Sequence, residues 1–374
     1  MSILLLILGL ILFVGLVVVH EFGHYIMARR GGVEVEEFGI GFPPRAKVLG
    51  TKKGTVYTLN WLPLGGFVKL KGENDADVAK GSFGAARLST KVNIMLAGVV
   101  MNLLTAFAML TLLALIGMPK LIENQFTVAS DTHVIQQDVL VGYVEPDSPA
   151  AIAGLQVRDK IVSITHENTQ SLVTSADNLP SITKSLAGQS VQLNLVRSGQ
   201  QTQTTVALRT ADEVEASKKT DNPKGYLGIS PTEYIVQRST WSAPIMAAGF
   251  IKQVTQLTFK GLGTALAGLF QGNTAKASSQ VAGPVGIFVL LRDGSLLGYR
   301  FILIIIAIIS LTLAIINALP IPALDGGRLF VTLLFRAIRK PLGKKTEDWI
   351  HGTGFAALML LFVLITIVDV KRFL

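Results

Sequence analysis

Four long apolar stretches constrain this chain more than any other feature of its sequence. They lie within residues 1–28, 92–118, 300–327 and 354–371. A helix needs roughly 20 apolar residues to cross a hydrocarbon core about 30 Å thick. Half of all residues are hydrophobic and only 16% are charged, which is the balance of a membrane protein. We therefore predict a predominantly α-helical, polytopic membrane protein with four transmembrane helices.

The first apolar stretch could also be a secretory signal peptide. Such a peptide begins with basic residues and ends at a small-residue cleavage site. No Lys or Arg precedes this stretch, and no Ala-x-Ala site follows it. We therefore predict that it is a membrane helix.

The distribution of Lys and Arg predicts how the helices are oriented. Basic residues gather in 29–91 and 328–353, and short loops rich in Lys and Arg lie on the cytoplasmic side of membranes. Both segments are therefore expected in the cytoplasm, with the two termini and residues 119–299 outside. Because the net charge of +9 is concentrated in these two segments, we expect the lipid bilayer as a partner and no nucleic acid.

Residues 128–210 have the composition of a soluble domain. Short β-branched runs alternate there with turns rich in Gly, Pro, Asp and Asn, as in a small mixed α/β domain. From Gly142 the sequence GYVEPDSPAAIAGLQVRDKIVSI resembles a PDZ domain with its carboxylate-binding loop. We predict an extracytoplasmic PDZ-like α/β domain that can accept an extended peptide ligand by strand addition. The alternative is a packing domain that only shields the membrane site.

Residues 211–299 are expected to follow as an extracytoplasmic amphipathic segment. Trp241–Gly272 could instead form a fifth transmembrane helix, but Lys252 and Lys260 interrupt it. A fifth span would also place the two basic segments on opposite sides of the membrane. We therefore predict an amphipathic helix that lies on the outer membrane interface.

The pattern His20-Glu21-Phe22-Gly23-His24 within the first stretch indicates a metal site. Four residues apart on a helix, the two imidazoles lie on one face and can bind one zinc ion, while the intervening Glu can act as a base toward a zinc-activated water. Two histidines near a helix end could also simply face lipid headgroups. Their place within an apolar span favours a functional site, because polar groups are costly there. The chain has no cysteine, so a thiolate zinc site is excluded.

A catalytic zinc ion needs a third protein ligand. The nearest carboxylates in sequence are Glu34, Glu36 and Glu37. They lie beyond a Gly-Gly pair, in a segment whose alternation is typical of a strand. Asp325 is the better candidate, because it follows two helix-breaking prolines at the end of the third stretch, where irregular backbone is tolerated only beside a protein cavity. With alternating helix directions, His24 and Asp325 lie on the same cytoplasmic side.

Asn317 lies about two helical turns before Asp325 in the motif NALPIPALDGG. Its amide could donate a hydrogen bond to the scissile carbonyl or to the oxyanion that develops from it. It could equally hold the broken helix end through backbone hydrogen bonds, and both roles stay open. At 1.5 Å per residue, His20 lies roughly 25 Å along its helix, so the predicted site is in the inner part of the membrane.

These and several further motifs resemble the site-2 protease family, in its bacterial regulator-of-sigma-E protease branch. The resemblance covers nearly the whole chain. It is carried by HEFGH, ARRGGVEVEEFGIGF, LPLGGFVKLKGE, Gly98 and Asn102 in the second stretch, the PDZ-like domain, AGPVGI and NALPIPALDGG. Some relatives carry two tandem PDZ-like domains, whereas this chain has room for one.

The resemblance implies a zinc-dependent intramembrane protease of the bacterial inner membrane. Its zinc ligands would be His20, His24 and Asp325, its catalytic base would be Glu21, and Asn317 would contact the substrate. Such an enzyme cleaves a single-span membrane protein, such as an anti-sigma factor, inside the bilayer. The cut usually follows removal of the substrate's outer domain by another protease.

The resemblance also implies a membrane-associated β-hairpin within residues 29–91 that presents a strand to the substrate. The sequence supports this in part, because Val56–Leu62 and Gly66–Leu70 are strand-like and flank a Pro-Leu-Gly-Gly turn. Adding the substrate as a further strand would unwind its helix and expose the peptide bond. The alternative is a cytoplasmic loop that plugs the site.

Two other classes of protein compete with a protease. A catalytically silent scaffold could dock partners through the PDZ-like domain, but the intact Glu21 disfavours it. A transporter could use the Pro-broken third helix as an ion site, but no second Pro-broken span provides a matching inverted repeat. The remaining histidines lack ligand spacing and are expected at the surface: His133, His166 and His351.

Overall fold

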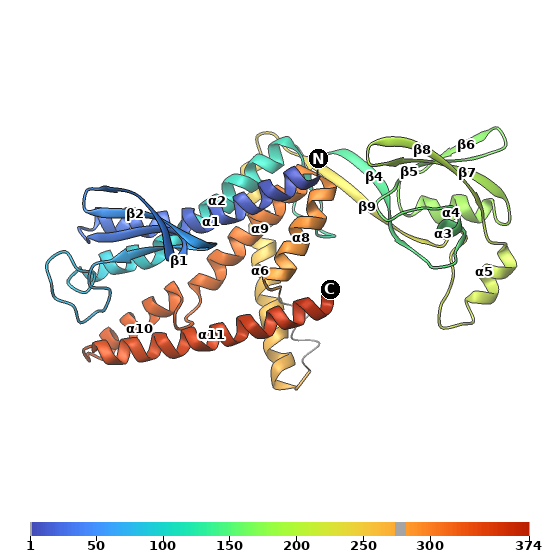
Figure 1. Ribbon diagram of the computed structural model, residues 1–374. Helices are drawn as coiled ribbons and strands as arrows, with labels where there is room; N and C mark the ends of the chain where they lie inside the picture. The colour runs from blue at the N-terminus through green and yellow to red at the C-terminus, as the bar shows by residue number, and fades with distance from the viewer. Residues whose placement is uncertain (1, 274–281, 374) are drawn as a thin grey trace. The chain divides into compact units, whose positions relative to one another are not determined.

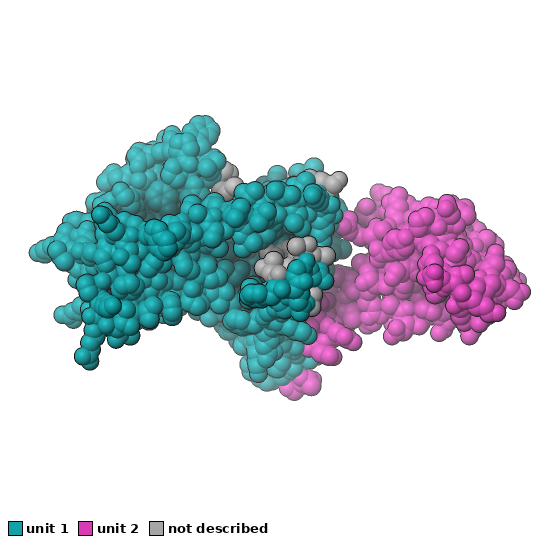
Figure 2. Space-filling model, turned by 90° about the horizontal axis from the view of Figure 1, so that it is seen from below, with its two compact units in different colours: residues 1–116, 126–128, 241–374 teal, residues 117–125, 129–240 magenta. Residues whose placement is uncertain are grey.

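The computed structural model describes residues 2–273 and 282–373, and it divides into two compact units (Figures 1 and 2). Unit 1 comprises residues 1–116, 126–128 and 241–374, and unit 2 comprises residues 117–125 and 129–240. The predicted outer segment 211–299 is thus divided between the units, and its part at 274–281 lies outside the described residues.

Unit 1 is built mainly from helices, drawn in Figure 1. They are α1 (Ser2–Arg30), α2 (Leu88–Ile116), α6 (Ala243–Phe270), α8 (Pro284–Leu297), α9 (Tyr299–Ala318), α10 (Asp325–Ala337) and α11 (Lys344–Phe373). Within the described residues, four helices are long and apolar enough to cross a membrane, namely α1, α2, α9 and α11. They coincide with the four predicted stretches. Residues 243–270 form a helix that is not among these four, and its place at the interface stays a prediction.

Most helices of unit 1 pack around α1 and α2, whereas α11 contacts α8. A buried apolar cluster joins α1, α8 and α9 through Leu16, Leu291 and Ile302. Gly23 on α1 touches α2, because a Cβ atom there would lie only 2.7 Å from the Ala97 carbonyl oxygen. This backbone contact places the histidine face of α1 directly against α2.

Helix α1 ends at the Gly-Gly pair that the sequence placed there. Gly32 has a φ of +77°, and the amide of Val33 donates to the carbonyl of Ala28 at 2.9 Å. A glycine in the left-handed region commonly closes a helix in this way. The chain then enters β1 (Val35–Lys52), which pairs with β2 (Thr55–Leu70) in an antiparallel hairpin.

The hairpin turn lies at Lys53–Gly54, where both φ angles are positive, at 51° and 82°. Two-residue hairpin turns favour such angles, because their twist matches that of the strands. The chain also turns back at the predicted Pro-Leu-Gly-Gly segment, because Leu59 and Gly66 both pair with Ile40 and the two halves of β2 run in opposite directions along β1. Phe38 in β1 pairs with Tyr57 on one side and with Val68 on the other. Residues 66–70 thus form an outer strand of the hairpin.

The chain after α9 forms a short irregular segment and a new helix. Helix α9 ends at Ala318, and Pro320 and Pro322 lack the amide hydrogens that would continue it. Asp325 therefore does not end the third span but begins α10. Most of 328–353, expected as a connecting loop, is helical. Helix α10 escaped prediction because its buried face is short: Gly326, Gly327, Val331 and Thr332.

Helix α11 is attached to the rest of unit 1 near its ends. Among its described residues, only Glu347 and Asp369 are buried. Glu347 accepts a hydrogen bond from the backbone amide of Asp75 at 2.7 Å. Asp369 accepts from the amides of Gly283 and Gly286 at 2.8 and 2.7 Å. The middle of α11 exposes apolar side chains such as Leu360, which is 62% exposed.

Unit 2 contains, in its described part, a seven-stranded sheet with the order β3-β9-β4-β5-β7-β8 and with β6 beside β5. The strands are β3 (Met118–Pro119), β4 (His133–Val144), β5 (Lys160–His166), β6 (Thr169–Leu172), β7 (Ser190–Arg197), β8 (Gln200–Ala207) and β9 (Ile229–Arg238). Three short helices complete it, α3 (Pro149–Ile152), α4 (Asn178–Ser185) and α5 (Ala211–Ser217). Because β9 pairs with β4, the unit continues past residue 210.

The segment that resembles a PDZ domain folds around a buried apolar core in unit 2. Val141, Ile164 and Leu193 are fully buried in this core. Ser148 caps α3, because its hydroxyl accepts a hydrogen bond from the Ala151 amide at 3.2 Å. A short helix therefore begins directly after Ser148 in the Ser-Pro-Ala segment.

Candidate metal centre

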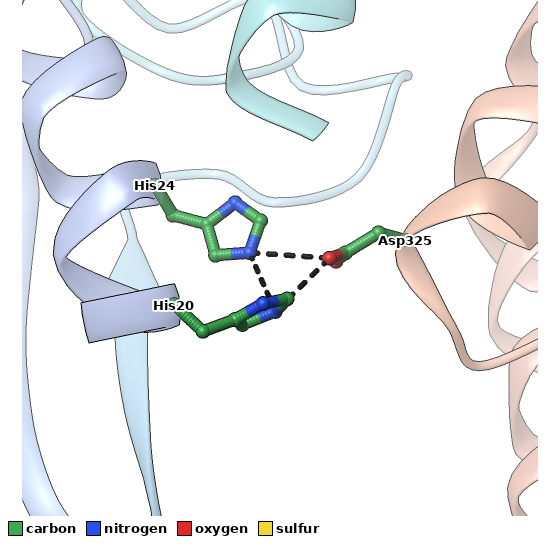
Figure 3. A group of neighbouring side chains, drawn as sticks. All are labelled: His20, His24 and Asp325. Carbon is green, nitrogen blue, oxygen red and sulfur yellow. Dashed lines mark hydrogen bonds and ion pairs between the residues drawn. The ribbon is translucent and has the colours of Figure 1, made fainter. Parts of the chain in front are cut away.

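Two histidines of α1 and one aspartate at the start of α10 point toward one another (Figure 3). The Nε2 atoms of His20 and His24 lie 3.1 and 3.3 Å from Oδ2 of Asp325, and 3.2 Å from each other. Both histidines are buried, each 9% exposed. The structure thus brings together three predicted site residues from opposite ends of the chain.

The three side chains fit a zinc ion. A tetrahedral ion with ligands at roughly 2.0 to 2.1 Å holds its ligand atoms about 3.3 Å apart, which matches the separations of 3.1 to 3.3 Å seen here. Oδ2 of Asp325 is buried, and no described donor meets it with hydrogen-bond geometry. Two imidazoles and one carboxylate also form a donor set of catalytic zinc sites.

Helix α2 supports the two imidazoles from behind. Nδ1 of His24 lies 2.7 Å from the carbonyl oxygen of Ile94, which can only accept a hydrogen bond. Nδ1 therefore carries the proton, and the lone pair on Nε2 faces Asp325. Gly98 leaves room for both rings, because a Cβ atom there would lie 2.5 Å from atoms of His20 and of His24.

The side chain of Asn102 completes the contact between α2 and the histidines. Its Nδ2 lies 3.2 Å from Nδ1 of His20. Sequence reasoning placed Gly98 and Asn102 in the second span but assigned them no role. Their spacing of four residues, like that of the two histidines, was the signal that could have paired the two helix faces.

Glu21 lies beside a cavity of about 130 Å³ next to the three side chains. Glu21, His24 and Asp325 line one wall of this cavity, and Val68 and Leu70 of the hairpin line another. The backbone of Val68 is within hydrogen-bonding reach of the Glu21 carboxylate. The predicted base and the outer strand of the hairpin therefore face the same small space.

Arg328, one turn after Asp325, closes the cavity on the side of α10. Its guanidinium stacks 4.8 Å from the centre of the Phe83 ring and donates a hydrogen bond to the backbone carbonyl of Glu73. Sequence reasoning missed these contacts, because they join segments that only the fold brings together. They fix the first turn of α10, and with it the backbone of Asp325.

Asn317 is half-buried in the last turn of α9. Its side chain forms no hydrogen bond to another described residue, and it does not line the cavity. Its role stays a prediction.

The three glutamates considered as alternative ligands lie in or just before the hairpin and pair with basic residues. Glu34 lies 2.9 Å from Lys71, and Glu36 lies 2.8 Å from Lys69. Glu37 lies 2.7 Å from Arg45. None of these three carboxylates therefore belongs to the cluster of His20, His24 and Asp325.

One of the other histidines has a local role that the sequence did not suggest. Nδ1 of His351 on α11 accepts a hydrogen bond at 3.2 Å from the amide of Ala323. Ala323 has a φ of +74° and lies two residues before Asp325. His351 therefore holds the irregular segment that leads into the site.

Comparison with known proteins gives consistent matches along the chain. A model of peptidase family M50 matches residues 8–361. Two relatives, from Clostridium perfringens and Clostridium acetobutylicum, are provisionally named zinc metalloproteases. They are 31% and 32% identical to this chain over 97% and 99% of its length, and over 97% and 98% of their own. The zinc metalloprotease RasP of Geobacillus kaustophilus is 26% identical over 97% of both chains.

Proposed function

Because the chain belongs to peptidase family M50 and is a membrane zinc metalloprotease, we propose that it hydrolyses a peptide bond within a transmembrane segment of another protein. The observation that carries this proposal is that His20 and His24, on a helix long enough to span a bilayer, meet Asp325 at the start of α10. These three side chains would hold the zinc ion. Their burial and their donor atoms support that assignment.

Glu21 is the group that moves the proton in this proposal. When bound, zinc supplies Lewis-acid activation of a water molecule and of the scissile carbonyl. The Glu21 carboxylate faces the cavity next to His24 and accepts a proton as the water oxygen bonds to the carbonyl carbon. It then donates that proton to the leaving amine as the carbon–nitrogen bond breaks.

The outer strand of the hairpin would bind the substrate. Residues 66–70 pair with β1 on one side only, and Val68 lies beside Glu21. A substrate segment added to this edge becomes extended, because its backbone hydrogen bonds go to the strand instead of to its own helix. An unwound segment presents its peptide bond to the cavity. Asn317 would donate a hydrogen bond to the substrate carbonyl from the last turn of α9.

The position in the cell and the substrates belong to the same proposal. The two termini and unit 2 lie outside the cytoplasm of a bacterial inner membrane, and the site opens toward its cytoplasmic side. The substrates are single-span membrane proteins such as anti-sigma factors, cleaved after a first protease has removed their outer domain. Unit 2 acts as a PDZ-like domain that binds a peptide. The charge distribution and the resemblance of GYVEPDSPA to PDZ loops support these assignments.

Glu21→Gln separates metal binding from catalysis. We expect the purified wild-type protein to contain zinc and to cleave a model transmembrane substrate in detergent micelles. The Gln variant should retain zinc but lose at least about 100-fold in rate, because it cannot accept the proton. Asp325→Ala should lose zinc as well as activity. Cleavage by Glu21→Gln at the wild-type rate, or a wild-type protein without zinc, would contradict the mechanism.

Glu215→Gln is the matched control for this experiment. Glu215 lies on α5 of unit 2, where it pairs with Lys218 and its side chain is 69% exposed. The substitution makes the same chemical change at a residue that lines neither the cavity nor the outer strand of the hairpin. We expect it to leave both zinc content and cleavage unchanged.

A further inference from the structure

We propose that Asn102 is a positioning residue that selects the metal-binding tautomer of His20. The proposal rests on the ligand set given under the proposed function. The proposal concerns Nδ1 of His20, the ring nitrogen that faces α2. The other ring nitrogen of His20, Nε2, faces Asp325.

The two histidines meet different partners on α2. Nδ1 of His24 faces the Ile94 carbonyl oxygen at 2.7 Å, an acceptor that requires the proton on Nδ1 and leaves the lone pair on Nε2. Nδ1 of His20 faces the amide nitrogen of Asn102 at 3.2 Å. That nitrogen is a donor, so it favours the opposite tautomer, with the proton on Nε2. A protonated Nε2 has no lone pair for a metal ion.

Rotation of the Asn102 amide removes this conflict. A half-turn about the last side-chain bond exchanges the amide oxygen and nitrogen, which occupy nearly the same space. The oxygen Oδ1 then accepts a hydrogen bond from a protonated Nδ1 of His20. In the structure Oδ1 is buried without a hydrogen-bond partner, an arrangement that is rare in folded proteins. The reversed orientation therefore satisfies Oδ1 and frees Nε2 of His20 for zinc.

Burial and a backbone hydrogen bond hold Asn102 in place beside His20. Only 1% of the residue is exposed, and its backbone carbonyl accepts a hydrogen bond from the Ser310 hydroxyl of α9 at 2.8 Å. Ile94, Gly98 and Asn102 follow one another at intervals of four, so they lie along one face of α2. This face thus supplies an acceptor for each histidine and the space between them.

The test compares zinc dissociation constants of purified full-length variants in detergent micelles, measured against a competing chelator. Asn102→Leu removes the acceptor at similar volume and should weaken zinc binding about 10–100-fold, as is typical when a ligand loses its outer hydrogen bond. Asn102→Asp offers only acceptors when ionised and should bind zinc at least as tightly as the wild type.

Thr105→Val is the matched control on the same helix. The Thr105 hydroxyl donates to the Met101 carbonyl of α2 itself at 2.8 Å, away from both histidines. Its removal should leave zinc affinity unchanged. Equal affinity in the wild type and in Asn102→Leu would overturn the proposal. Equal weakening in the Asp and Leu variants would also overturn it, because it would show that the amide acts as a donor.

A second measurement covers the case in which Asn102→Leu does not fold. The chain has five histidines, so their ring nitrogens can be followed by ¹⁵N NMR of the zinc-loaded protein, with His20→Gln to assign the His20 signals. We expect a protonated Nδ1 whose signal moves in Asn102→Asp. An unprotonated Nδ1, or a signal that Asn102→Asp leaves unmoved, would overturn the proposal. A wild type that binds no zinc would instead overturn the ligand set.

Discussion

At the scale of single residues, Gly98 decides how closely α2 can approach the two imidazoles. A methyl group at this position would meet His20 and His24 at distances below ordinary van der Waals contact. Neither ring can move away freely, because Nδ1 of each is in hydrogen-bonding distance of α2. The observed positions of the two imidazoles therefore require a residue without a side chain at position 98.

Gly98→Ala should lower zinc affinity by at least about tenfold, because it displaces imidazoles that outer contacts hold in place. The control is Gly15→Ala on α1, where a Cβ atom would meet no atom within 4 Å. That substitution should leave zinc affinity unchanged. Both can be measured by chelator competition in detergent micelles. Equal affinities in the two variants would show that α2 yields to the added methyl group.

The sequence predicted the residues of the site to the extent that their signals were local. His20, Glu21 and His24 share one helix face, and their spacing shows it directly. Asp325 required an argument about helix direction across some three hundred residues. The carbonyl of Ile94 could not be predicted at all, since every residue carries one and only the packing of α1 on α2 selects it.

At the scale of elements, an ion pair ties the segment after β2 to the start of α2. The Lys91 side chain is only 4% exposed, and it forms an ion pair with Asp75. The backbone amide of Asp75 in turn donates to Glu347 of α11. This contact therefore connects the hairpin, α2 and α11 on one side of the candidate site.

Lys91→Met should destabilise the protein by roughly 3 kcal/mol, because it leaves the partner carboxylate without compensation in a largely buried place. Lys69→Met is the control, since Lys69 and Glu36 are 59% and 45% exposed. Exposed pairs of this kind contribute about 0–1 kcal/mol. Denaturant unfolding of both variants in micelles measures the difference. Equal losses of stability would contradict a special role for the buried pair.

The elements show where sequence patterns were sufficient. The four long apolar helices follow from apolar length alone, and the end of α1 follows from Gly31–Gly32. The reversal at Pro-Leu-Gly-Gly follows from its turn signals. The second turn, at Lys53–Gly54, carries weaker signals and was not predicted. Helix α10 has 13 residues and is too short to cross a bilayer, so the search for long apolar stretches left it within a loop.

At the scale of the whole molecule, the orientation in the membrane can be tested directly, because the chain has no native cysteine. Gln200 at the start of β8 and Thr346 near the start of α11 are both exposed. With unit 2 outside, Gln200→Cys should react with a membrane-impermeant maleimide in intact spheroplasts. Thr346→Cys should react only after lysis. The reverse pattern of labelling would refute the proposed orientation.

Helix α11 has a consequence for motion within the bilayer. Its two buried residues are carboxylates near its ends, each bonded to backbone amides, while its middle contacts little of the protein. Lipid tails are as apolar as the side chains they would replace. Exchanging lipid for another apolar helix along the middle of α11 therefore changes the free energy little. The stiffness of a helix held at its two ends, and not the rupture of a packed core, therefore sets how far the middle of α11 can bend.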